Sequence, residues 1–84
     1  MKYCLITFRS VTPAQRAEGL ARRGGVDCHL QRTPRWMEEQ GCGYSLRLRH
    51  ADVVRCLELL RKNQVAFRKI YLLREDGGVE ELTL

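Results

Sequence analysis

The 84-residue sequence is poor in several features that mark common classes of protein: it has two prolines, one tryptophan and no long hydrophobic run. A transmembrane helix needs about 18 or more consecutive apolar residues, so none is expected. The apolar stretch near the N-terminus, residues 3–8, is too short for a signal peptide. We therefore expect a cytoplasmic protein, in a compartment where thiols are normally kept reduced.

The sequence also lacks the close ligand pairs that bind structural zinc. There is no Cys-x-x-Cys pair, and neither His29 nor His50 stands at ligand spacing from a cysteine. No metal site and no resident cofactor is expected. A glycine-rich phosphate loop and a paired-carboxylate motif are missing as well, which argues against nucleotide chemistry and acid–base hydrolysis. Whether the protein is an enzyme stays open, with a non-catalytic role favoured.

The length predicts a single domain, residues 1–84, with a core over about 2–74 and a tail or edge strand over 75–84. The net charge is +5, carried by 12 arginines and three lysines. Such a balance can steer an anionic partner, either RNA or an acidic protein face. It is also compatible with an ordinary solvated surface.

Hydrophobic periodicity predicts alternating strands and helices. Residues 12–15 resemble a helix start, with Thr12 as N-cap, Pro13 in the first turn and Gln15 completing a capping box. Gly24 and Gly25 then end this helix. The predicted strands are 3–8, 26–31, 44–49 and 66–74, the helices about 13–23 and 51–63, and the possible edge strand 79–82.

The buried faces follow from the same periodicity. In the strand 44–49, Tyr44, Leu46 and Leu48 form the apolar set. The inward face of the second helix is predicted to consist of Val53, Val54, Cys56, Leu57 and Leu60.

This order of elements is β-α-β-β-α-β, which predicts an α+β, ferredoxin-like fold. We expect a four-stranded antiparallel sheet with both helices on one face and a possible C-terminal edge hairpin. Right-handed crossovers then place the strands 3–8 and 44–49 side by side at the centre.

Cys42 is the cysteine that the sequence marks out for chemistry. The other three cysteines lie in predicted strands or helices, where a thiol usually behaves as a small buried hydrophobe. Cys42 lies in a predicted loop between Gly41 and Gly43, which leave the backbone free to bend and to meet a partner. Reactivity depends on the thiolate, which electropositive, partly open surroundings favour.

The predicted topology supplies such surroundings. The strand that follows Cys42 begins where the strand 3–8 ends and the first helix starts. Cys42 is therefore expected near Arg9, Ser10 and the backbone N–H groups around Thr12, with Arg35 adding positive charge. The positive end of a helix dipole stabilises an adjacent anion, and the hydroxyl of Ser10 or Thr12 can donate a hydrogen bond to the sulfur. Neither histidine is expected within reach, so a Cys–His hydrolase is not predicted.

Several short motifs together resemble a known family. They are Phe8-Arg9-Ser10, Ala17-Glu18, Thr33-Pro34-Arg35, Cys42-Gly43 and Leu46-Arg47. In this order and spacing, over residues 3 to about 73, they resemble the Se/S carrier-like proteins of bacteria.

That resemblance implies that Cys42 holds sulfur or selenium as a persulfide or selenosulfide. It also implies a cysteine desulfurase or a selenium-pathway protein as donor or acceptor. Family members often have serines before the Cys-Gly pair. Here Glu38, Glu39, Gln40 and Gly41 stand there, and the two acidic residues oppose ionisation of the thiol.

Two other functions remain open from the residues alone. Ferredoxin-like domains include RNA-binding modules, which stack bases on aromatic residues of the central strands, but the RNA-binding signature is missing here. The same fold also serves as a protein-interaction or regulatory module, including homodimers formed through the sheet.

Overall fold

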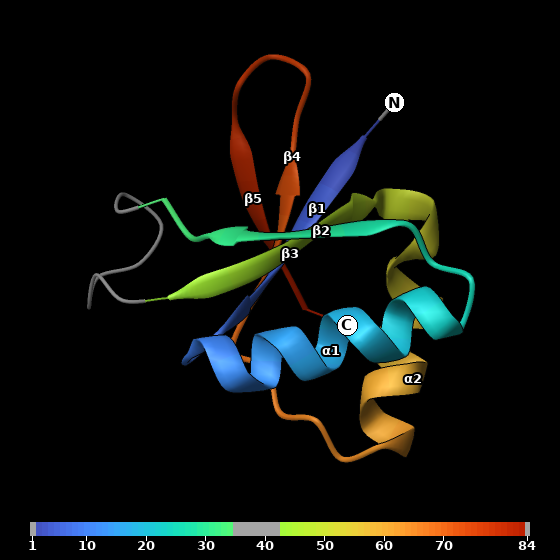
Figure 1. Ribbon diagram of the computed structural model, residues 1–84. Helices are drawn as coiled ribbons and strands as arrows, with labels where there is room; N and C mark the ends of the chain where they lie inside the picture. The colour runs from blue at the N-terminus through green and yellow to red at the C-terminus, as the bar shows by residue number, and fades with distance from the viewer. Residues whose placement is uncertain (1, 35–42, 84) are drawn as a thin grey trace.

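The computed structural model describes residues 2–34 and 43–83 as two helices, a 3₁₀ turn and five strands (Figure 1). The bounds are β1 Tyr3–Phe8, α1 Val11–Arg23, β2 Cys28–Arg32, β3 Tyr44–Arg49, η2 His50–Asp52, α2 Val53–Lys62, β4 Ile70–Leu73 and β5 Val79–Leu82.

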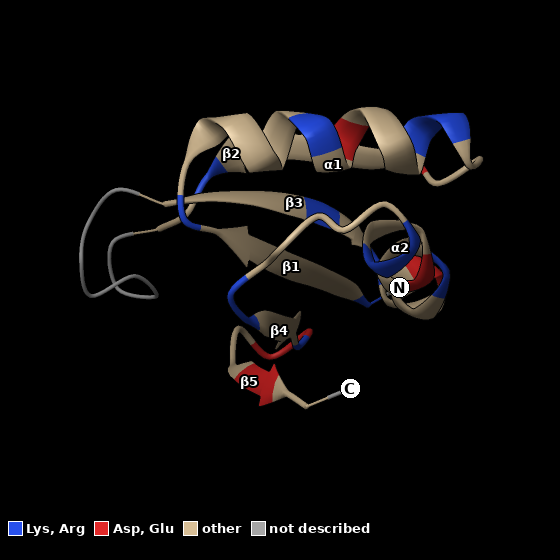
Figure 2. Cartoon of the chain, turned by 90° about the horizontal axis from the view of Figure 1, so that it is seen from below, with Lys and Arg blue, Asp and Glu red and all other residues tan. Residues whose placement is uncertain are grey.

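The strands form one antiparallel sheet in the order β2-β3-β1-β4-β5. Both helices lie on the same face, and the sheet twists strongly from β2 to β5 (Figures 1 and 2). The α+β class, the helix placement and the pairing of β1 with β3 agree with the sequence prediction. The predicted four-stranded, ferredoxin-like arrangement is matched only in part, because β5, expected as a possible edge strand, adds a fifth strand to the sheet.

A tight turn brings β5 onto β4. Gly77 adopts a positive φ of 89°, which a glycine takes without a steric penalty. The Arg74 N–H donates to the Gly78 carbonyl over 2.8 Å and closes the hairpin. The tail that was expected as a possible edge strand is thus a regular part of the sheet.

The core lies between the sheet and the two helices. Alternate residues of β1, β3 and β2 point into it, and their partners point to the opposite face, called here the outer face. Tyr44 packs against the core and Leu46 and Leu48 are buried in it, as predicted. The buried core residues are Cys4, Ile6, Phe8, Ala14, Ala17, Ala21, Val26, Cys28, Leu46, Leu48, Val53, Cys56, Leu57, Leu60, Val65, Ile70 and Leu72.

Helix α1 packs closely on the sheet through small residues. Ala14, Ala17 and Ala21 are fully buried along one stripe, and their short side chains let the helix backbone approach the strands. At its C-terminal end, a Cβ on Gly24 would come within 2.5 Å of Leu59 Cδ1, so α2 also packs tightly against this end.

The same helix covers the open edge of β2. The Glu18 carboxylate accepts the Leu30 N–H over 3.2 Å, and Arg22 donates to the Cys28 carbonyl over 2.8 Å. Glu18 and Arg22 also form an ion pair at 3.4 Å. Unpaired backbone groups on an edge strand would otherwise be free to pair with another chain.

Several details of the predicted elements were wrong. Helix α1 begins at Val11 with Ser10 at the N-cap, so Thr12 and Pro13 lie inside the first turn, where proline is still tolerated. Val54 is 60% exposed and does not face the core. Strand β4 begins only at Ile70, because the Lys69 N–H donates to the Thr7 hydroxyl and the pairing is irregular before it.

We expect Glu18→Ala to lower the free energy of unfolding by about 1–2 kcal/mol, because the Leu30 N–H loses its acceptor at a partly buried position. Glu18→Gln keeps an acceptor oxygen and should lose less. Urea denaturation of both variants measures this, with Glu58→Ala on the exposed side of α2 as the control. An unchanged midpoint for Glu18→Ala would contradict the role given to this carboxylate.

Candidate functional site

One end of the sheet gathers the described residues of the predicted thiol site. Phe8, the last residue of β1, pairs with Tyr44, the first residue of β3. Helix α1 starts just after β1, and the Thr33 N–H donates to the Gly43 carbonyl over 3.0 Å. The start of α1, the end of β2 and the start of β3 therefore meet at this end (Figure 1).

The predicted site residues divide into two groups. Arg9, Ser10 and Thr12 are exposed near the start of α1, and Gly43 is buried at the start of β3. The other members of the predicted site lie outside the described residues; they are Arg35, Gly41 and Cys42.

The start of α1 is electrostatically suited to an anion. The first turn contains no acidic residue, so the positive end of the helix dipole is not neutralised from within the helix. Ser10 stands at the N-cap but makes no side-chain cap hydrogen bond. Its hydroxyl thus does not cap the helix, and Arg9 adds a full positive charge beside it.

Two buried hydroxyls at this end were missed by the sequence reasoning. Ser45 is 0% exposed and Thr33 is 8% exposed, and neither side-chain oxygen has a hydrogen-bond partner among residues 2–34 and 43–83. Both belong to the outer face of the sheet, since Ser45 pairs with Gln31 and Thr33 lies beside Gly43. A buried hydroxyl without a partner is costly and rare, which often marks a binding position.

The pattern around Ser45 explains the omission. Ser45 alternates with Tyr44 and Leu46, so the sequence placed it on a solvent-facing side of the strand. Its burial comes from tertiary packing, which the alternation of side chains along a strand does not predict. Thr33 carried a signal, because it opens the Thr33-Pro34-Arg35 motif of the family resemblance, but no role was attached to it.

The other three cysteines are structural, as predicted. Cys4, Cys28 and Cys56 are each 0% exposed. Burial raises the pKa of Cys4 to about 11 and that of Cys56 to about 11. Burial also raises the pKa of Cys28, although a hydrogen bond and the charge of Arg22 oppose the effect. These thiols are kept neutral and out of reach at pH 7.

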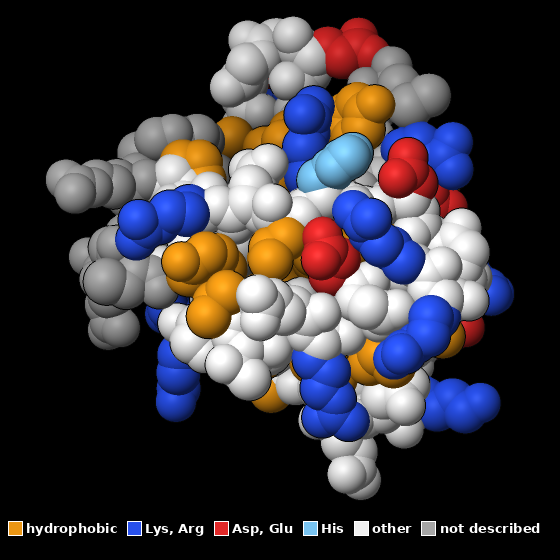
Figure 3. All heavy atoms as spheres, viewed as in Figure 1, with side chains coloured by type: hydrophobic (Ala, Val, Ile, Leu, Met, Phe, Trp, Pro, Cys, Tyr) orange, Lys and Arg blue, Asp and Glu red, His pale blue; other side chains and the backbone are white. Residues whose placement is uncertain are grey.

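The basic residues do not gather into one surface. Lys and Arg are spread over α1, α2 and β3 in Figure 2, and they are scattered over the face seen in Figure 3. Some are also paired, as with Lys69 and Glu81 at 3.4 Å and Arg49 and Asp52 at 3.1 Å. This distribution gives little support to a continuous track for a nucleic-acid backbone.

Comparison with known proteins gives the family. A family model described as Putative Se/S carrier protein-like matches residues 3–72, from the start of β1 into β4. The chain belongs to this family. No match was found among curated proteins or among solved structures. Among the described residues, neither helix has the length and apolar character needed to cross a membrane.

The match gives a physical meaning to one motif of the resemblance. Within Ala17-Glu18, the alanine is fully buried where α1 meets the sheet, and the glutamate holds the edge of β2. The motif is therefore structural. The matched range also includes Cys42-Gly43, the pair at the predicted thiol site.

Because burial raises the pKa values of Cys4 and Cys56, we expect the free energy of unfolding to fall at alkaline pH. A thiol with a folded-state pKa of about 11 and an unfolded value near 9.0 favours the folded state fully below pH 9, and this contribution is lost as pH rises through 11. At pH 10 the loss is about 1.4 kcal/mol for each thiol. Urea denaturation at pH 8 and pH 10 should show it.

The matched control is the Cys4→Ala, Cys56→Ala double variant. It should be less stable at pH 8 because of lost packing, but its stability should fall less between pH 8 and pH 10 than that of the wild type. Equal losses in the two proteins would contradict burial as the cause of the raised pKa values.

Proposed function

We propose that the protein carries sulfur or selenium on the thiol of Cys42 and passes it to a partner protein. The family match across Cys42-Gly43 is the observation that supports this most directly. The described surroundings of Gly43 add support, because the start of α1 and Arg9 favour an anion at this end of the sheet.

The reaction is a thiol exchange without net oxidation. The Cys42 thiolate attacks the terminal sulfur of a persulfide on the donor, a new S–S bond forms, and the donor's cysteine leaves as a thiolate. The product is a persulfide on Cys42, whose terminal atom the acceptor then attacks in the same way. With a terminal selenium atom, the same exchange gives a selenosulfide.

The neighbours have distinct roles in this proposal. The N-terminus of α1 and Arg9 lower the pKa of the thiol and of the bound persulfide. The free hydroxyls of Ser10, Ser45 and Thr33 are donors for a sulfur anion. We expect Arg35 to act with Arg9 and Thr12 to lie beside them.

The partners follow from the chemistry. The donor must present a persulfide or its selenium equivalent, which is the product of a cysteine desulfurase or of a selenium-pathway protein. Gly41, next to Cys42 in the sequence, has no Cβ to hinder the close approach of such a partner to the backbone. We place the exchange in the cytoplasm, because there thiols are kept reduced and available for loading.

Loading on Cys42 is tested by intact-protein mass spectrometry after incubation with a cysteine desulfurase and cysteine. The wild type should gain one sulfur atom, lost again on treatment with dithiothreitol, while Cys42→Ala gains none. Because Cys42→Ala retains the other three cysteines, it also tests whether Cys4, Cys28 and Cys56 stay unloaded. Equal loading of the two proteins, or none on the wild type, would refute the carrier function. A stable dimer without loading would then favour an interaction module.

The Ser45→Ala variant distinguishes an effect on folding stability from an effect on the reactivity of the Cys42 thiol. Because the Ser45 hydroxyl has no partner to lose, the free energy of unfolding should change by less than about 0.5 kcal/mol. If the hydroxyl donates to the Cys42 thiolate, the pKa of that thiol should rise, and alkylation at pH 7 should slow several-fold. Ser10→Ala, which removes a hydroxyl from the exposed N-cap, provides the comparison. Unchanged alkylation in Ser45→Ala would remove Ser45 from the site.

A further inference from the structure

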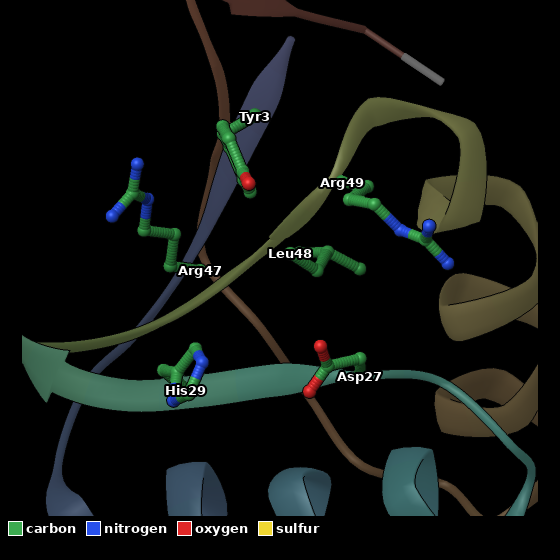
Figure 4. A pocket seen from close by; sticks show the side chains of 6 residues that line it. All are labelled: Tyr3, Asp27, His29, Arg47, Leu48 and Arg49. Carbon is green, nitrogen blue, oxygen red and sulfur yellow. The ribbon is translucent and has the colours of Figure 1, made fainter. Parts of the chain in front are cut away.

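A hollow of about 330 Å³ opens on the outer face of the sheet, over β1, β2 and β3 (Figure 4). It is lined by Tyr3, Asp27, His29, Arg47, Leu48 and Arg49. It adjoins the end of β3 that lies away from Gly43, so it is separate from the thiol site. Binding pockets for small molecules begin at about 300 Å³, which makes the hollow suitable for a compact ligand.

Arg47 is held in place over an aromatic ring. Its guanidinium carbon lies 4.3 Å from the centroid of the Tyr3 ring. Stacking fixes the plane of a guanidinium but leaves its N–H groups free at the edge, where they can bind a carboxylate through two parallel hydrogen bonds.

The hollow contains two opposite charges that are not neutralised. Within residues 2–34 and 43–83, Arg47 has no carboxylate partner and Asp27 has no basic partner within ion-pair distance. Arg49, the strand neighbour of Asp27, instead pairs with Asp52 at 3.1 Å. The hollow therefore offers one guanidinium and one carboxylate to a ligand.

The strand register sets the spacing of the backbone positions that carry these charges. Arg47 pairs with His29, so Asp27 is its diagonal neighbour across the β2–β3 edge. Diagonal neighbours on adjacent antiparallel strands are about 7–8 Å apart. Both side chains line the same hollow, so one small ligand can contact both. Figure 4 shows the two side chains on different sides of the hollow.

We propose that this hollow binds a small zwitterion of the α-amino-acid type, with its carboxylate on Arg47 and its ammonium group on Asp27. The Tyr3 ring provides apolar surface for a short side chain, and His29 offers a further hydrogen bond. A phosphate fits less well, because the unpaired Asp27 carboxylate repels a dianion. Binding here does not depend on the thiol of Cys42.

The test is a ¹H–¹⁵N NMR titration of the full chain with L-alanine. Propionate lacks the ammonium group, alaninamide lacks the carboxylate, and inorganic phosphate is a pure anion. We expect L-alanine to shift the amides of residues 3, 27–29 and 47–49 at millimolar concentration. Each half-ligand, and phosphate, should bind about tenfold more weakly or not at all, since one charge-assisted contact is missing.

Variants assign the two contacts. Asp27→Asn and Arg47→Gln should each weaken L-alanine binding about tenfold. Glu58→Gln and Arg23→Gln, which are exposed on α2 and α1, should leave it unchanged. Tighter binding of phosphate than of L-alanine would overturn the proposal in favour of an anion site. Shifts that are absent, scattered over the surface or insensitive to Asp27→Asn would refute it.

Discussion

The close packing of α1 on the sheet is the contact on which the rest of the structure depends. Ala14, Ala17 and Ala21 have no side-chain bulk to hold the helix away, so its backbone approaches the strands. In this position Glu18 and Arg22 form hydrogen bonds with backbone groups of β2 and cover its edge. The same placement fixes the positive end of the helix beside the start of β3. A larger residue in the alanine stripe would therefore disturb the core, the edge and the candidate site together.

Much of the fold was predictable, because strand periodicity and antiparallel pairing are strong local signals. The bounds of β1 and β3 match the prediction, and their pairing placed Phe8 beside Tyr44. The errors have physical causes. Both Ser10 and Thr12 are suitable N-cap residues for α1, and the sequence alone does not decide between them. Val54 is apolar but lies beside the buried stripe of α2, so its hydrophobicity gave the wrong face. The place of β5 depends on the turn closed between Arg74 and Gly78, which pairs it with β4.

The candidate site was predictable only where topology decides proximity. The meeting of Arg9, Ser10 and Gly43 follows from the pairing of β1 with β3 and needs no side-chain detail. The burial of Ser45 and Thr33 does not, because a hydroxyl on an outer sheet face normally reaches water. The charges around the hollow escaped prediction for a similar reason. A sequence shows that Arg47 and Asp27 exist, but register and rotamers decide that they remain unpaired.

The two ends of β3 differ in a way that suits two different kinds of chemistry. Near Gly43 the outer face has neutral donors, the buried hydroxyls, and the start of α1 lies at the same end of the sheet on its opposite face. Neutral donors stabilise a sulfur anion without forming a fixed ion pair, so the anion remains free to react with an incoming thiolate. Near Arg49 the face has full charges that are exposed to water, where contacts are screened and ligands exchange rapidly. The proposed thiol exchange at one end and the proposed ligand binding at the other can therefore be tested by separate substitutions.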